Sequence, residues 1–119
     1  MKFDDGDLLV ELVCLDEDAM NKLDFGVVRM DRKGMVTFYN EYESRLSGLS
    51  KEKTIGRHFF EQVAPCSNNY LVSQRFWDEP ELDAIVPYIF TFKMKPTPVR
   101  LRLLRSRASE AIYLLVERT

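Results

Sequence analysis

Apolar and polar residues alternate with different spacings along the chain, and the spacing predicts which segments form helices and which form strands. In residues 8–23 the apolar residues follow a loose helical stripe with acids on the other side. The Asp-rich start of "DEDAMNKL" predicts a break, so two short helices are expected here. "FGVVRM" and "MVTFYN" then predict two strands, and "DRKG" between them predicts the tight turn of a hairpin.

The middle of the chain predicts several helices. Asn40 is a favourable capping residue for a helix through "EYESRLSG", and Gly48 is suited to end that helix. "TIGRHFFEQV" predicts a further helical turn, which Pro65 closes. After Cys66, "SNNYLVSQRFWDEPEL" opens with capping residues and predicts the longest helix of the chain.

Three apolar stretches complete the chain and predict strands. They are "AIVPYIFTFKM", "TPVRLRLLRS" and "AIYLLVER", with the turn-like "ASEA" before the last. The predicted order is therefore two strands, several helices and three strands. Strands grouped around a helical middle favour an α+β fold with an antiparallel sheet.

Composition limits the classes of function. The 119 residues fit one domain, and 45% apolar with 30% charged residues is typical of a globular chain. The net charge of −2 provides no basic surface for nucleic acid, and no apolar run reaches the roughly 18 residues of a membrane span. The two cysteines stand in unlike contexts and predict no disulfide framework, so a reduced, cytoplasmic setting is expected.

Charge is unevenly distributed along the chain. Residues 1–24 hold eight acids and two lysines, a net charge of −6, which leaves +4 for the rest. Four arginines stand in residues 99–107, and such a run is most often a solvated strand face. The alternative is that the acidic N-terminal segment docks against this basic strand. Most of the docking would then come from apolar contacts of Leu8, Leu9, Leu12 and Val13.

Candidate chemistry centres on Cys66 in "VAPCSNNY". A nucleophilic enzyme needs a base near the thiol, and the single histidine, His58, is better explained as an exposed helical residue. No Cys/His cluster has the spacing of metal ligands and no glycine-rich phosphate loop is present, so a hydrolase or transferase is not expected. A helix N-terminus at Cys66 would favour a thiolate, and a small buried hydrophobe explains the same residue equally well.

Three separated segments change this balance. "FYNEYESRLSG", "IGRHFFEQVAPC" and "YIFTFKMKPTPVRLRL" closely resemble matching segments of the photoactive yellow protein family, blue-light photoreceptors of the PAS superfamily. The resemblance runs over residues 23–119, with a shorter loop near residues 78–84, and "VAPC" after "IG" and a Phe pair is its most specific part. It implies a PAS fold, a five-stranded antiparallel sheet with helices on one side and an N-terminal helical cap. The cap is expected over residues 1–22 and the PAS core over residues 23–119.

The same resemblance implies a covalent chromophore. Cys66 is the expected attachment point for p-coumaric (4-hydroxycinnamic) acid, through a thioester. Tyr39 and Glu43 match the two donors to the phenolate oxygen, and Ser47 stands where the family usually has threonine. Burial beside an anion is expected to keep Glu43 protonated, because it raises the pKa of a carboxyl.

Further matches are to the wall of the chromophore pocket, although each of these residues is equally explicable as core. They are Val28, Leu49, Phe59, Val63, Ala64, Phe90, Phe92 and Met94. Leu49 stands where the best-known members carry an arginine over the pocket, so solvent access and colour or cycle rate are expected to differ. Phe92 replaces a tyrosine, and Met94 matches the methionine associated with thermal return of the chromophore.

The resemblance therefore predicts a photoreceptor and not an enzyme. Blue light is expected to isomerise the trans double bond, after which Glu43 loses its proton. The buried carboxylate left behind, without compensation, would loosen the N-terminal cap. One alternative is a chromophore-free PAS module in bacterial signalling that acts through dimerisation or a partner protein, and a redox sensor based on Cys66 is a third hypothesis. The expected partner is a downstream signalling protein, with no nucleic acid and no membrane, and the chain is expected to be a monomer or weak homodimer.

Overall fold

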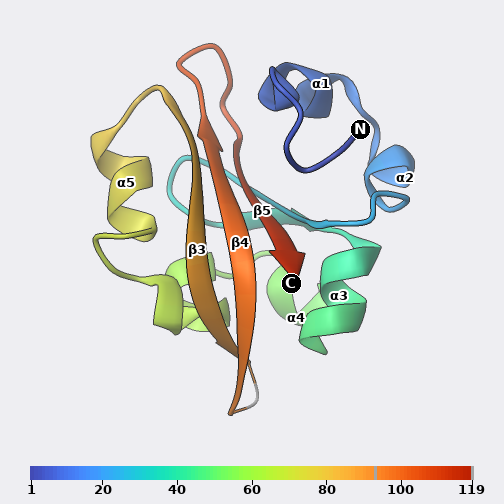
Figure 1. Ribbon diagram of the computed structural model, residues 1–119, viewed down its shortest axis with the longest axis vertical. Coiled ribbons are helices and arrows are strands. Elements are labelled where there is room, and N and C mark those ends of the chain that lie inside the picture. The colour runs from blue at the N-terminus through green and yellow to red at the C-terminus, as the bar shows by residue number, and fades with distance from the viewer. Residues whose placement is uncertain (93, 119) are drawn as a thin grey trace.

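A five-stranded antiparallel sheet forms the centre of the protein (Figure 1). The computed structural model describes residues 1–92 and 94–118, so Lys93, in a predicted strand, and Thr119, the end of the predicted core, lie outside the described residues. The helical elements are α1 (Leu8–Cys14), α2 (Glu17–Met20), α3 (Glu41–Ser47), α4 (Lys51–Thr54), the π-helical turn η1 (Phe59–Val63), the 3₁₀ turn η2 (Pro65–Ser67) and α5 (Ser73–Asp78). The strands are β1 (Gly26–Met30), β2 (Val36–Tyr39), β3 (Leu82–Phe92), β4 (Lys95–Arg105) and β5 (Ile112–Arg118), in the order β2-β1-β5-β4-β3.

Each face of the sheet carries its own apolar cluster, because successive residues of a strand point to opposite faces. In β5, Leu114 lies in the cluster that includes side chains of η1 and α5, whereas Tyr113 and Leu115 lie in the cluster that includes side chains of α1 and α2. Figure 1 shows α5 and the α1–α2 pair on opposite sides of the sheet. The predicted α+β architecture, with helices on one side of the sheet and an N-terminal helical layer, is confirmed.

The predicted turns and caps around the first hairpin are confirmed. Gly34 ends the "DRKG" turn with φ 91°, a left-handed backbone conformation that favours glycine. The Asn40 side chain accepts a hydrogen bond from the backbone N–H of Glu43 at 3.1 Å, which caps α3. Gly48 ends α3 with φ 78°. These local signals fix where α3 begins and ends, and therefore where its polar side chains lie.

The segment after Cys66 does not form the longest helix, so that prediction is wrong. Helix α5 has six residues, whereas α1 and α3 have seven each. The side chain of Asn69 accepts hydrogen bonds from the backbone N–H groups of Leu71 and Val72, at 2.9 and 3.3 Å. Such side-chain bonds offer the backbone an alternative to a helix, and α5 begins only at Ser73.

The acidic N-terminal segment lies against the basic strand β4. Arg100 donates two hydrogen bonds to the Asp4 carboxylate, at 3.0 and 2.8 Å. Arg102 is only 4% exposed and donates to the backbone carbonyl groups of Phe3 and Asp5, at 2.9 and 2.5 Å. Docking, rather than a solvated strand face, is therefore confirmed for these two arginines.

Apolar packing accompanies these polar contacts, with one correction. Leu8 and Leu12 are fully buried in the cluster beneath α1, and Leu9 packs against it partly buried. Val13 is 54% exposed, so its expected contribution is wrong, because the short α1 turns that position toward solvent. Within residues 1–92 and 94–118, every helix is too short or too polar to span a bilayer.

Candidate functional site

Cys66 lies on η2, partly buried and packed against the main apolar cluster. The turn is held by its own bonds, since the Ser67 hydroxyl donates to the carbonyl of Ala64 at 2.7 Å. The predicted helix N-terminus at Cys66 is wrong, because η2 is a single 3₁₀ turn and α5 begins at Ser73. The thiol is therefore placed by a tight turn at the edge of the core.

Two residues that sequence analysis missed hold the backbone of Cys66 in place. The Tyr88 hydroxyl donates to the Cys66 carbonyl at 2.5 Å. The Asn69 amide donates to the Tyr88 hydroxyl oxygen at 2.5 Å and to the same carbonyl at 3.3 Å. The Asn pair after Cys66 was a visible signal, whereas nothing in the sequence relates Tyr88 to a residue 22 positions away.

Tyr39 and Ser47 are brought together as predicted. Tyr39 ends β2 and is fully buried, and its hydroxyl oxygen lies 2.9 Å from Ser47 Oγ. Burial, together with the nearby Glu43 carboxyl, raises the pKa of Tyr39 well above its ordinary value. The Tyr39 hydroxyl therefore keeps its proton and is available as a donor within the core.

Glu43 is buried on α3, and the fully buried Asn40 fixes the start of that helix. Asn40 Oδ1 accepts from the backbone N–H of Val27 on β1 as well as from that of Glu43, at 3.0 and 3.1 Å. Asn40 Nδ2 donates to the carbonyl groups of Met20 and Phe25, at 2.9 and 3.0 Å. One side chain thus ties α3 to β1 and to the end of α2, which explains why Glu43 points into the core.

The Glu43 carboxylate accepts two hydrogen bonds from Arg118 at the end of β5, at 2.7 and 2.9 Å. Burial raises the pKa of Glu43, and the Arg118 guanidinium acts in the opposite direction. The expectation that a deprotonated Glu43 has no compensating charge is therefore wrong in this arrangement. Strand alternation was the signal for Arg118, because Leu114, Val116 and Arg118 share the inner face of β5.

Gly26 on β1 is shaped to receive Glu43. A Cβ atom added at Gly26 would lie 2.1 Å from Glu43 Oε1 and 3.2 Å from Glu43 Cβ. The first distance is too short for any real contact and the second is a tight one, so the Glu43 carboxylate can hold its present position because residue 26 has no side chain.

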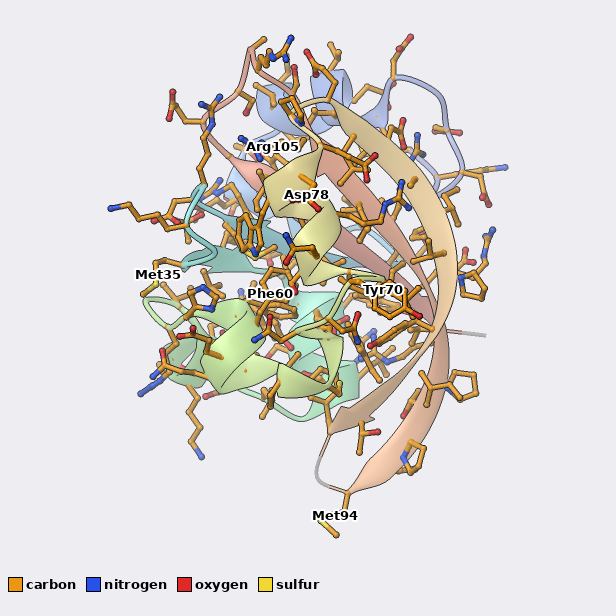
Figure 2. All side chains as sticks on the ribbon, turned by 90° about the vertical axis from the view of Figure 1, so that its left-hand side faces the viewer. Met35, Phe60, Tyr70, Asp78, Met94 and Arg105 are labelled. Carbon is orange, nitrogen blue, oxygen red and sulfur yellow. The ribbon has the colours of Figure 1, made fainter. Side chains whose placement is uncertain are left out.

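The structure brings together all but one of the predicted wall residues. Those buried in the main apolar cluster are Val28, Phe59, Ala64, Phe90 and Phe92, and Leu49 and Val63 pack against it partly buried. Met94 is 92% exposed at the tip of the β3–β4 hairpin (Figure 2). The strands pair as far as Phe92 opposite Lys95, so the chain reverses at Met94, which has φ 65°. The prediction that Met94 lines the pocket is wrong for this conformation.

A thiol, two hydroxyl groups and a carboxyl lie in or beside this cluster. Cys66 offers a thiol at the edge of the cluster, and Tyr39 and Ser47 offer hydroxyl groups within the core. Glu43 adds a carboxyl that can donate only when it is protonated. Across the described part of the chain, no group of three or more His, Cys, Asp and Glu side chains is placed to hold a metal ion.

Comparison with known proteins identifies the family. No family model matches the chain. The photoactive yellow protein of Rhodothalassium salexigens is 28% identical over 121 residues, which cover 99% of this chain and 97% of that protein. The photoactive yellow protein domain of the sensor histidine kinase Ppr from Rhodospirillum centenum is 34% identical, with a TM-score of 0.80, and the match covers 87% of this chain and 94% of that domain. The chain belongs to the photoactive yellow protein family.

More distantly related structures also share the PAS fold of this photoactive yellow protein family member. The PAS domain of an HTR-like protein from Haloarcula marismortui has a TM-score of 0.72 at 13% identity, over 94% of this chain and 95% of that domain. The predicted family and fold are therefore confirmed. Members of this family are PAS-type photoreceptors, so the relatives support a sensory role for the chain.

Proposed function

We propose that this chain is a blue-light photoreceptor in which Cys66 carries a p-coumaroyl group as a thioester. The observation that supports the proposal is the shared cluster: the Cys66 turn packs against the same apolar core as Tyr39 and most of the predicted wall residues. When bound, the p-coumaroyl group supplies blue-light absorption and trans-to-cis isomerisation. The chain turns over no substrate in this role.

Each polar residue of the site has its own role in the proposed function. Tyr39 keeps its proton and would donate to the phenolate oxygen of the bound group, with Ser47 orienting its hydroxyl. With the group bound, Glu43 would hold a proton in the dark, since burial raises its pKa, and would pass that proton to the phenolate oxygen after isomerisation. The apolar wall excludes water, so the change of charge at Glu43 occurs in a medium of low dielectric constant, where it acts strongly on its neighbours.

Attachment and output place demands on other parts of the chain. In the attachment step Cys66 Sγ forms a bond to the acyl carbon of an activated p-coumaric acid, and the thiol proton leaves with the activating group. The N-terminal segment passes the signal to a downstream signalling protein, with the chain acting as a monomer or weak homodimer. The Rhodospirillum centenum relative is a domain of a sensor histidine kinase, which supports a role as a signalling input.

Reconstitution tests the proposal. Chromophore-free protein is mixed with activated p-coumaric acid, and we expect a visible absorption band that bleaches in blue light and a mass increase of one coumaroyl group. Cys66→Ala should show neither, whereas Cys14→Ala, which removes the exposed thiol at the end of α1, should show both. A folded wild-type protein that forms no band would favour the alternative, a chromophore-free PAS interaction module.

A further inference from the structure

The pair between Glu43 and Arg118 differs from the other ion pairs in its burial. The Glu43 side chain is 1% exposed and that of Arg118 is 13% exposed. The next pair by burial of both partners, Arg100 with Glu117, leaves these side chains 35% and 33% exposed. Within residues 1–92 and 94–118, the Glu43–Arg118 pair is the one in which both side chains are less than a fifth exposed.

The geometry of this pair is that of a carboxylate held by a planar fork. Two guanidinium nitrogens of Arg118 each face one oxygen of Glu43, at 2.7 and 2.9 Å. Arginine suits this arrangement because its donors are fixed in a plane and its charge is not lost at any physiological pH. Both oxygens of Glu43 act as acceptors here, so this is the arrangement of the deprotonated side chain.

Other elements contribute groups that face the same point. Tyr39 reaches it from β2, and its hydroxyl stays neutral because its pKa is raised. The ring of Tyr42 on α3 lies 5.8 Å from Arg118 Cζ, a favourable distance for a cation over an aromatic ring. Gly26 on β1 leaves the space that Glu43 Oε1 occupies. The guanidinium therefore sits among a carboxylate, a phenol ring and a neutral hydroxyl, and a second cation on this side is Arg45, whose Cζ lies 5.9 Å from the same Tyr42 ring.

We propose that Arg118 is the cation of the candidate site and holds the Glu43 carboxylate whenever Glu43 has lost its proton. The part that concerns light rests on the proposed function, whereas the pairing itself does not. If Glu43 loses its proton in the light, Arg118 receives the new carboxylate and the pocket stays electrically balanced. Arg118 is thus a positioning residue that sets how long Glu43 stays deprotonated.

The pairing is tested first in chromophore-free protein. Carbon-13 signals of the Glu43 carboxyl and nitrogen-15 signals of the Arg118 guanidinium are followed by NMR as pH is varied. We expect both to change at one common midpoint in the wild type. Arg118→Met should move the Glu43 midpoint upward by about one pH unit or more, a tenfold change in proton affinity, and Arg118→Lys should fall between the two.

Arg75→Met is the matched control. Arg75 on α5 pairs at 2.8 Å with Glu79, which directly follows that helix, and this pair is far more exposed than the pair at Glu43, so its loss should leave the Glu43 midpoint unchanged. An equal Glu43 midpoint in the wild type and in Arg118→Met overturns the proposal. If Arg118→Met does not fold, the wild type alone gives the test. Nitrogen-15 signals of Arg118 that stay constant while Glu43 titrates would also overturn the proposal.

The light-dependent part has its own measurement. In reconstituted protein, Arg118→Met should return to the dark state at least about tenfold faster, because the carboxylate of Glu43 loses its partner and regains its proton sooner. An unchanged return rate overturns this part. A common midpoint in chromophore-free protein, together with no visible band after reconstitution, would leave the pairing in place and refute the proposed photoreceptor function.

Discussion

Replacing Gly26 by alanine tests how firmly Glu43 is held. The new Cβ would lie 2.1 Å from Glu43 Oε1 and 3.0 Å from Cδ, so the carboxylate has to leave its present position. We expect that movement to disrupt the paired bonds from Arg118. Breaking a buried pair costs about 3–5 kcal/mol, and the 13% exposure of Arg118 places the expected loss of unfolding free energy nearer about 2–4 kcal/mol.

A double-mutant cycle by urea unfolding separates this effect from ordinary crowding of the core. A Glu43→Ala background removes the Oε1 and Cδ atoms and leaves only the Cβ contact at 3.2 Å, so Gly26→Ala should then cost about 1 kcal/mol or less. Gly6→Ala is the control, because a Cβ atom there meets nothing within 4 Å. If Gly26→Ala costs the same with and without the Glu43 side chain, the carboxylate is not fixed by Arg118 and the reasoning fails.

Three further predictions concern pH, the N-terminal segment and the cysteine turn. Because the pKa of Glu43 is raised above its ordinary 4.5, the folded protein binds this proton more tightly than the unfolded chain does. The stability that this proton contributes is present below pH 4.5, and it is lost as pH rises through the pKa of Glu43 in the folded protein. The difference in unfolding free energy between the wild type and Glu43→Gln should therefore fall over that range, and a difference independent of pH would contradict the raised value. Leu12→Ala should speed amide exchange throughout residues 3–20, because a fully buried leucine is worth about 2–5 kcal/mol. Asp4→Asn should have a much smaller, salt-dependent effect, since its pair is exposed; equal effects would show that charge and not apolar packing docks the segment. Tyr88→Phe should cost about 1–2 kcal/mol and speed exchange in η2, whereas Tyr70→Phe, at an exposed position, should change neither.

Local signals in the sequence predicted much of the fold because they act within a few residues. The "DRKG" turn, the Asn40 cap and the Gly48 end of α3 each depend on backbone geometry that their own side chains decide. The prediction of a long helix after Cys66 failed for a reason that is also local. The Asn69 side chain accepts hydrogen bonds from backbone N–H groups that a helix would use.

Contacts between distant segments were predicted less completely. Resemblance to a family located Cys66, Tyr39 and Ser47, but it carried no information on which charge faces Glu43. Arg118 stands 75 positions from Glu43 and meets it only because β5 pairs with β1 in one register. The prediction that Met94 lines the pocket failed because the register of β3 and β4 places this residue at the hairpin tip. A sequence does not display that register.

The end of β5 connects the candidate site to the N-terminal segment. Glu117 and Arg118 are consecutive, so their side chains point to opposite faces of the sheet. Arg118 faces inward and holds Glu43, while Glu117 faces outward and accepts from Arg100 at 2.8 and 2.6 Å. Arg100 in turn binds Asp4. If Glu43 changes its charge as proposed, the change acts through Arg118 on the same strand end that positions the N-terminal segment, and it reaches the surface there along β5.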